Sequence, residues 1–255
     1  MFRSHKIGLA LSGGGVRGLA HIGVIKALTE AGIQPVVVAG VSAGSIVGAG
    51  FADGMDWRGL TAMARSVFWP SLLHGGRLER FCAEHLSETY AKLSLPFAAI
   101  ATSVPERQVI TITEGHLGSA ISASCAIPYL RRPVAREGRR LVDGGVACVM
   151  PSTACRELGA EFIIASDVWE YSSLMRAAGC HPARPAHRRF YPGHYLRALH
   201  HTDLHIHPSI PIAGYAPGAA AIERMIAAGE EAAHRALARL GRDSLEDSAP
   251  HAIST

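Results

Sequence analysis

The chain contains three short glycine-containing segments whose residue types could support catalysis or ligand binding. They are SGGGVRG (residues 12–18), GVSAG (residues 40–44) and DGG (residues 143–145). The second has the form G-x-S-x-G, which presents a serine hydroxyl on a sharp strand-to-helix turn. A serine hydroxyl is a poor nucleophile without a base, so the pattern raises the question of what assists Ser42.

The surroundings of Ser42 favour a catalytic turn over a structural one. An apolar run at residues 36–39 predicts a buried strand, and small residues at 45–52 predict a helix. Gly40 and Gly44 stand two residues to either side of the serine, where the absence of a Cβ lets neighbouring backbone pass closely. The N-terminus of the following helix favours developing negative charge. The alternative is a tight turn with no catalytic role.

The first segment, after a strand expected at residues 6–11, allows two interpretations. Gly13, Gly15 and Gly18 match the spelling of a dinucleotide-binding loop. Such a loop needs an acidic residue about 20 positions further on, at the end of the second strand. Ala39 to Ser42 stand there, and none is acidic. The run therefore fits an anion cradle better, because successive glycine amides can converge on one anion.

The base for Ser42 is open at this level. One alternative is a Ser-His-Asp triad, since Asp167 follows a predicted strand and the chain has fourteen histidines. Half of those histidines gather in residues 181–207, a polar stretch, and none stands out. The other carboxylate of interest is Asp143, which also follows a predicted strand and opens the DGG segment.

Taken in order, SGGGVRG, GVSAG and DGG resemble the patatin-like phospholipases, a family of lipid acyl hydrolases with a Ser–Asp dyad. PFAAIATSV (residues 96–104) resembles the family's central strand, and residues 121–146 resemble its approach to the aspartate. LHIHPSIP (residues 204–211), followed by an Ala-rich helix, resembles the bacterial, neuropathy-target-esterase-like branch. The resemblance runs from about residue 6 to residue 240. It implies a three-layer α/β fold with a mainly parallel central sheet.

The resemblance also implies a role for each matching residue. Ser42 would be the nucleophile and Asp143 the general base. The remaining residues are the oxyanion hole (Gly13, Gly14, Gly15), its support (Arg17, Gly18), the nucleophile elbow (Gly40, Gly44) and the aspartate motif (Gly144, Gly145).

The implied reaction is cleavage of carboxylic ester bonds in phospholipids or lysophospholipids through an acyl-serine intermediate, with no metal or cofactor. Tyr129 and the Cys148–Val149 pair depart from the family's usual residues and leave the acyl pocket and substrate open. The alternatives are a catalytically silent, lipid-binding regulator of the same fold and a Ser-His-Asp esterase. The oligomeric state is open.

The remaining elements suit one domain over residues 1–255. Strands alternate with helices through residue 166, which predicts parallel pairing. Residues 170–201 are rich in Arg, His and Pro, so we expect a surface loop or lid there. An amphipathic helix is expected at 219–240 and a frayed tail at 241–255. His205 and His207 share one face of a short strand, which fits a polar face better than a metal site.

Composition limits the partners and the compartment. The chain is 48% hydrophobic with a net charge of +4, and it has no nucleic-acid-binding module. Five cysteines without CxxC spacing favour reduced thiols in the cytoplasm. No signal peptide or membrane-spanning run is expected, so contact with a membrane, such as the inner membrane surface, would be peripheral. The Arg-rich stretch at 184–197 fits a solvated loop better than a lipid-binding one.

Overall fold

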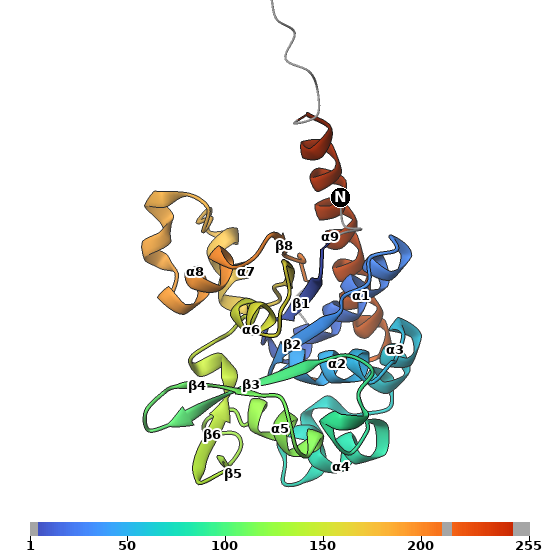
Figure 1. Ribbon diagram of the computed structural model, residues 1–255, viewed down its shortest axis with the longest axis vertical. Coiled ribbons are helices and arrows are strands. Elements are labelled where there is room, and N and C mark those ends of the chain that lie inside the picture. The colour runs from blue at the N-terminus through green and yellow to red at the C-terminus, as the bar shows by residue number, and fades with distance from the viewer. Residues whose placement is uncertain (1–4, 211–215, 247–255) are drawn as a thin grey trace, which may run out of the picture.

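The computed structural model describes residues 5–210 and 216–246, and one mixed sheet runs through its centre with helices on both faces (Figure 1). Across the described residues the strand order is β5-β6-β3-β2-β1-β7-β8, with β4 paired to β3. The strands β8, β7, β1, β2 and β3 run parallel, whereas β4, β5 and β6 pair antiparallel. The fold is therefore α/β with a mainly parallel sheet. The strands are β1 (Ile7–Leu11), β2 (Val37–Val41), β3 (Phe97–Val104), β4 (Val109–Ile112), β5 (Val134–Arg136), β6 (Arg139–Asp143), β7 (Phe162–Ser166) and β8 (Leu204–Ile206).

The helices fill the connections between strands. The α-helices are α1 (Ala20–Glu30), α2 (Ala43–Ala52), α3 (Trp57–Arg65), α4 (Arg77–His85), α5 (Leu117–Ser124), α6 (Ser152–Glu157), α7 (Glu170–Ala177), α8 (Gly193–His200) and α9 (Ala219–Glu246). Short 3₁₀ helices are η2 (Gly15–Leu19), η3 (Trp69–Leu73), η4 (Tyr90–Lys92), η5 (Gly144–Val146) and η6 (Pro185–Phe190).

The sheet separates two hydrophobic cores. Successive side chains of a strand point to opposite faces. On β1, Leu9 and Leu11 accordingly pack into the core under α1, α2 and α9, while Ala10 faces the core with α6 and α8. The same alternation continues on β3. Buried strands of this kind read as continuous apolar runs because both faces are covered.

Strand register brings the three glycine-containing segments to one level. Leu11 at the end of β1 pairs with Gly40 on β2, and Val41 pairs with Ile100 on β3. The next residue of β3, Ala101, pairs with Asp143 at the end of β6. The glycine loop, Ser42 and Asp143 therefore lie side by side along one line across the sheet. Asp143 joins them although its strand, β6, is antiparallel to β3.

At residues 170–201, where we expect a surface loop or lid, the loop is wrong because the stretch is helical, and a role as a lid stays a prediction. The stretch forms α7, η6 and α8 (orange in Figure 1), which pack beside the sheet. Because this stretch contains few aliphatic residues, aromatic rings form the buried contacts that aliphatic residues would otherwise make. Tyr195 is fully buried and stacks on Tyr191, with ring centroids 5.4 Å apart, and Trp169 packs against Tyr195 at 5.3 Å.

The last helix, α9, lies along α1 and extends past the predicted end at residue 240 to Glu246 (Figure 1). The predicted frayed tail thus begins within a helix, and residues 247–255 lie outside the described residues. Among the helices that the structure describes, none combines the length and the apolar character needed to cross a bilayer.

Candidate active site

Ser42 lies in a strained turn between β2 and α2. Its backbone φ is 51° and ψ is −124°, a conformation that non-glycine residues rarely adopt. A Cβ on Gly40 would stand 2.3 Å from the carbonyl oxygen of Gly44, and one on Gly44 would stand 2.4 Å from that of Leu11. Both positions therefore require glycine, and the G-x-S-x-G spacing predicted from the sequence has a steric cause.

Hydrogen bonds fix the backbone of Ser42 on both sides. Its amide donates to the Oγ of Ser124 on α5 at 2.9 Å. Its carbonyl accepts from the amide of Ser45 at 2.8 Å and from the Ser45 hydroxyl at 2.6 Å. The turn is thus held without using the Ser42 hydroxyl. Ser124 was not singled out from the sequence, and nothing in its local pattern points to this contact.

Asp143 ends β6 and is 7% exposed. Burial raises the pKa of its carboxyl to about 6, although hydrogen bonds from Ser42 and the Gly145 amide and the charge of Arg131 oppose the shift. The Gly145 amide donates to Oδ1 at 2.8 Å. At neutral pH the carboxylate is largely ionised yet close to its pKa, which suits a group that must accept and return a proton.

The glycine loop follows β1 and leads into η2. The Gly13 amide donates to the carbonyl of Val149 at 2.9 Å, so it is not available to an oxyanion, and this part of the predicted oxyanion hole needs correction. Gly14 and Gly15 stand at the start of η2, where backbone amides have no partner within the helix. Gly15 has a φ of 57°, which turns the loop toward the cleft.

Arg17 ties this loop to the segment that follows β7. Its Nε donates to the carbonyl of Val168 at 2.9 Å, and one terminal nitrogen donates to Ser173 Oγ on α7 at 2.7 Å. Gly18 packs against Ala43 closely enough that a Cβ there would stand 2.6 Å from the Ala43 Cβ. The loop therefore contacts both α7 and the first turn of the helix after Ser42.

His21 supports the loop from below and was not predicted from the sequence. The ring is fully buried, and burial lowers its pKa to about 4. Its Nε2 lies 2.9 Å from the carbonyl of Ser12 and its Nδ1 lies 2.7 Å from Ser166 Oγ. A neutral ring that donates from Nε2 and accepts at Nδ1 satisfies both contacts. The sequence feature that could have indicated this buried histidine is its position on the apolar face of the first helix.

Ser42 opens into two adjoining spaces. One is a cleft of about 470 Å³ lined by the glycine loop, Ser42, Asp143, Gly145 and Trp169, among others. The other is a smaller apolar pocket of about 90 Å³. Its walls include Trp69, Leu72, Leu73, Leu78, Ile127 and Leu130. Tyr129, one of the sequence departures, is fully exposed and lines neither space.

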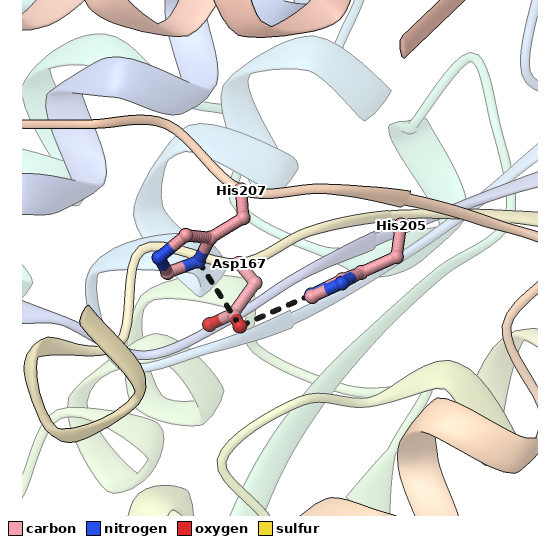
Figure 2. Close-up of side chains that lie close together, drawn as sticks. All are labelled: Asp167, His205 and His207. Carbon is pink, nitrogen blue, oxygen red and sulfur yellow. Dashed lines mark hydrogen bonds and ion pairs between the residues drawn. The ribbon is translucent and has the colours of Figure 1, made fainter. Parts of the chain in front are cut away.

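The alternative triad gains no support from this geometry. In the described part of the chain, no histidine lines either space that Ser42 opens into. Asp167, the acid of that alternative, instead contacts His205 Nε2 at 3.1 Å and His207 Nδ1 at 3.4 Å (Figure 2). His205 and His207, expected to form a polar face, are thus partly buried against the Asp167 carboxylate.

Two groups of side chains could in principle hold a metal ion in the described regions. They are Asp167 with His205 and His207, and Glu30 with Glu230 and His234, each with ligand atoms within 4.8 Å of one another. Neither group lies in the walls of the Ser42 cleft. The arrangement around Ser42 combines a strained serine, a buried carboxylate of raised pKa and unpaired amides at a helix start.

Comparisons with known proteins identify a family and several relatives that this chain resembles. A family model described as patatin-like phospholipase matches residues 9–153. An uncharacterized NTE family protein of Mycobacterium tuberculosis is 34% identical over 62% of this chain and 29% of its own length. Lysophospholipase NTE1 of Coccidioides immitis is 32% identical over 64% of this chain and 11% of its own. The chain thus spans less than a third of the length of these relatives.

Solved structures share the fold at low sequence identity. VipD from Legionella pneumophila superposes with a TM-score of 0.65 over 92% of this chain and 67% of its own, at 14% identity. The type III effector protein ExoU gives a TM-score of 0.52 over 92% of this chain and 53% of its own, at 16% identity. The architecture therefore extends well beyond the region that the family model matches.

Proposed function

Because this chain belongs to the patatin-like phospholipase family, whose model matches more than half of it, we propose that it hydrolyses carboxylic ester bonds of phospholipids or lysophospholipids. The observation that carries the proposal is the meeting of Ser42, Asp143 and the glycine loop in the walls of one cleft. The printed name of the Coccidioides relative, a lysophospholipase, supports the substrate class.

In the proposed first step, the Asp143 carboxylate accepts the proton of the Ser42 hydroxyl while Oγ attacks the ester carbonyl. A bond forms between Oγ and the carbonyl carbon, and the carbonyl oxygen becomes an oxyanion. The amides of Gly14 and Gly15 stabilise that charge, since they start η2 without helical partners. Collapse expels the alcohol, which takes the proton from Asp143 and leaves an acyl-serine.

In the second step, Asp143 accepts a proton from water, which attacks the acyl-serine carbonyl. The tetrahedral species collapses, Ser42 regains its proton, and the carboxylic acid leaves. The apolar pocket beside Ser42 suits the start of an acyl chain, because its walls are almost entirely aliphatic or aromatic. The more polar cleft, which also contains Arg17 and Glu170, suits the leaving alcohol with its headgroup.

The test uses a fluorophosphonate probe together with hydrolysis of p-nitrophenyl butyrate and lysophosphatidylcholine. Wild-type protein is expected to become labelled at Ser42 and to hydrolyse both esters, whereas Ser42→Ala should show neither activity at an unchanged melting temperature. Ser66→Ala, on the C-terminal cap of α3, is the matched control. Wild-type protein that resists the probe and cleaves neither ester would favour the lipid-binding regulator instead.

A further inference from the structure

A second cleft, separate from that of Ser42, lies between the α7–α8 region, β8 and α9. It measures about 710 Å³ and carries a strong excess of basic side chains. In the described residues, no Asp or Glu belongs to its lining. The basic residues in its walls are Arg176, His181, Arg188, His200, His205, His207, Arg235 and Arg239.

Arg176 lines this cleft, and its guanidinium has no carboxylate partner in the described residues. One terminal nitrogen donates to His181 Nε2 at 2.6 Å, and the other lies 3.4 Å from His205 Nδ1. Its Nε is buried and has no hydrogen-bond partner. A buried donor that is left unsatisfied is destabilising, so an acceptor that reaches this guanidinium from the cleft would be stabilised.

The same contacts disfavour a metal ion bound by Asp167, His205 and His207. A guanidinium only donates, so His205 Nδ1 must accept, which leaves the ring proton on Nε2 facing Asp167. Asp167 Oδ2 already accepts from the Tyr195 hydroxyl at 2.6 Å and from Ser172 Oγ at 2.9 Å. The His205 imidazole is thus a donor to the Asp167 carboxylate (Figure 2), and its other nitrogen faces Arg176.

The remaining arginines point to the kind of ligand. Arg235 and Arg239 are one turn apart on α9, and Arg188 belongs to η6. Arg235 also forms an ion pair with Glu231, an exposed residue of the same helix. An exposed ion pair of this kind contributes little free energy in water, so Glu231 competes only weakly with a phosphate. Planar guanidiniums bind phosphate oxygens in pairs, and arginine is the preferred residue for that contact. A cleft of this size accommodates a ligand with several phosphate groups.

We propose that the cleft formed by Arg176, Arg188, Arg235 and Arg239 is a binding site for phosphate groups, of a soluble polyphosphate ester or of an anionic lipid headgroup. The site shares no lining residue with the Ser42 cleft. The two are joined through α7, because His207 lies 3.4 Å from Ser173 Oγ, which also accepts from Arg17 of the glycine loop.

The test measures binding of two probes that separate the possible sources of phosphate. Isothermal titration with sodium tripolyphosphate reports a soluble ligand. Sedimentation with phosphatidylcholine vesicles, with and without 10% phosphatidic acid, reports a lipid headgroup. We expect at least one probe to bind, with affinity that falls as salt rises. The double variant Arg235→Gln, Arg239→Gln should weaken that binding about tenfold or more, as expected for losing charge-assisted hydrogen bonds.

Arg224→Gln is the matched control, because Arg224 is an exposed residue of the same helix outside the cleft. It should change binding of either probe by less than about twofold. Melting temperature and p-nitrophenyl butyrate hydrolysis, measured for all variants, separate loss of the site from loss of the fold. Absence of binding by both probes, or equal weakening in the control, would overturn the proposal. So would saturable Zn²⁺ binding in place of phosphate binding.

Discussion

Asp143, at the end of β6, and Asp167, directly after β7, are both buried aspartates, yet their pKa values are shifted in opposite directions. Burial raises the pKa of Asp143 to about 6. Burial also opposes ionisation of Asp167, but hydrogen bonds from His205 and His207 outweigh it and hold the pKa of that carboxyl well below its usual range. Depth in the protein therefore does not decide the protonation state of either group.

The difference lies in the donors that surround each carboxylate. Asp143 Oδ1 accepts from the Gly145 amide, and hydrogen bonding by the Ser42 hydroxyl also lowers its pKa. Asp167 accepts from Tyr195, Ser172 and the Trp169 amide in addition to the imidazoles. A carboxylate with few donors can exchange a proton, whereas one with many becomes a fixed structural anion. The first suits a base, and the second organises the α7–α8 region.

The largest expected effect separates the two aspartates by activity. Asp143→Asn should lower kcat/KM for p-nitrophenyl butyrate by about 10²–10⁴-fold, the range for loss of a general base. The unfolding free energy should change little or rise, because a buried charge with few donors is removed. Steady-state kinetics and urea denaturation measure the two quantities. Retained activity in this variant, lost instead on substituting a histidine, would establish the triad.

The second prediction concerns stability. Asp167→Asn should lower the unfolding free energy by about 1–3 kcal/mol, since it places an amide NH₂ among buried donors that would then lack an acceptor. Urea denaturation at pH 7 measures the loss.

The pH dependence of this loss follows from the direction of the pKa shift. Because the folded-state pKa of Asp167 is depressed, its contribution is present above the unfolded pKa and is lost as pH falls toward the folded value. The gap between wild type and Asp167→Asn should therefore narrow in acid. A gap that is constant from pH 7 to pH 3 would contradict the assignment of Asp167 as the ionised centre.

The smallest expected effect sharpens the description of Asp143. A base must be ionised, so kcat/KM should rise with pH through an apparent pKa of about 6. The charge of Arg131 lowers that pKa, so Arg131→Gln should move the acid limb to higher pH. Arg132→Gln, at the adjacent position, is the control and should leave the limb in place. If the acid limb of the pH profile is unmoved in both variants, the group that titrates there is not Asp143.

The sharp turn at Ser42 can be predicted from the sequence because the steric limits that produce it lie within a few residues. Two glycines flank the serine at positions where a Cβ would meet backbone within 2.4 Å. The alternation of apolar runs with helical patterns likewise predicted the parallel part of the sheet. These features depend on steric limits and burial within a few residues, which the order of residue types reflects directly.

Other features depended on contacts between distant segments. The Gly13 amide is occupied by the carbonyl of Val149, which no local pattern reveals. Residues 170–201 predict a loop or lid because they contain few aliphatic residues, whereas the helices that form there pack through aromatic rings. The burial of His21 and the cluster of basic side chains between α8 and α9 likewise cannot be predicted from local sequence, because both depend on contacts between distant segments.

The sequence by itself determined the turn at Ser42, the glycine loop and the order of the elements, because backbone sterics and apolar periodicity act locally. Only the tertiary structure decided how the two aspartates differ. Both follow predicted strands, and both read as acidic residues at strand ends. Their pKa values diverge because the number of donors around a buried carboxylate depends on which distant side chains the packing of the sheet and helices brings against it.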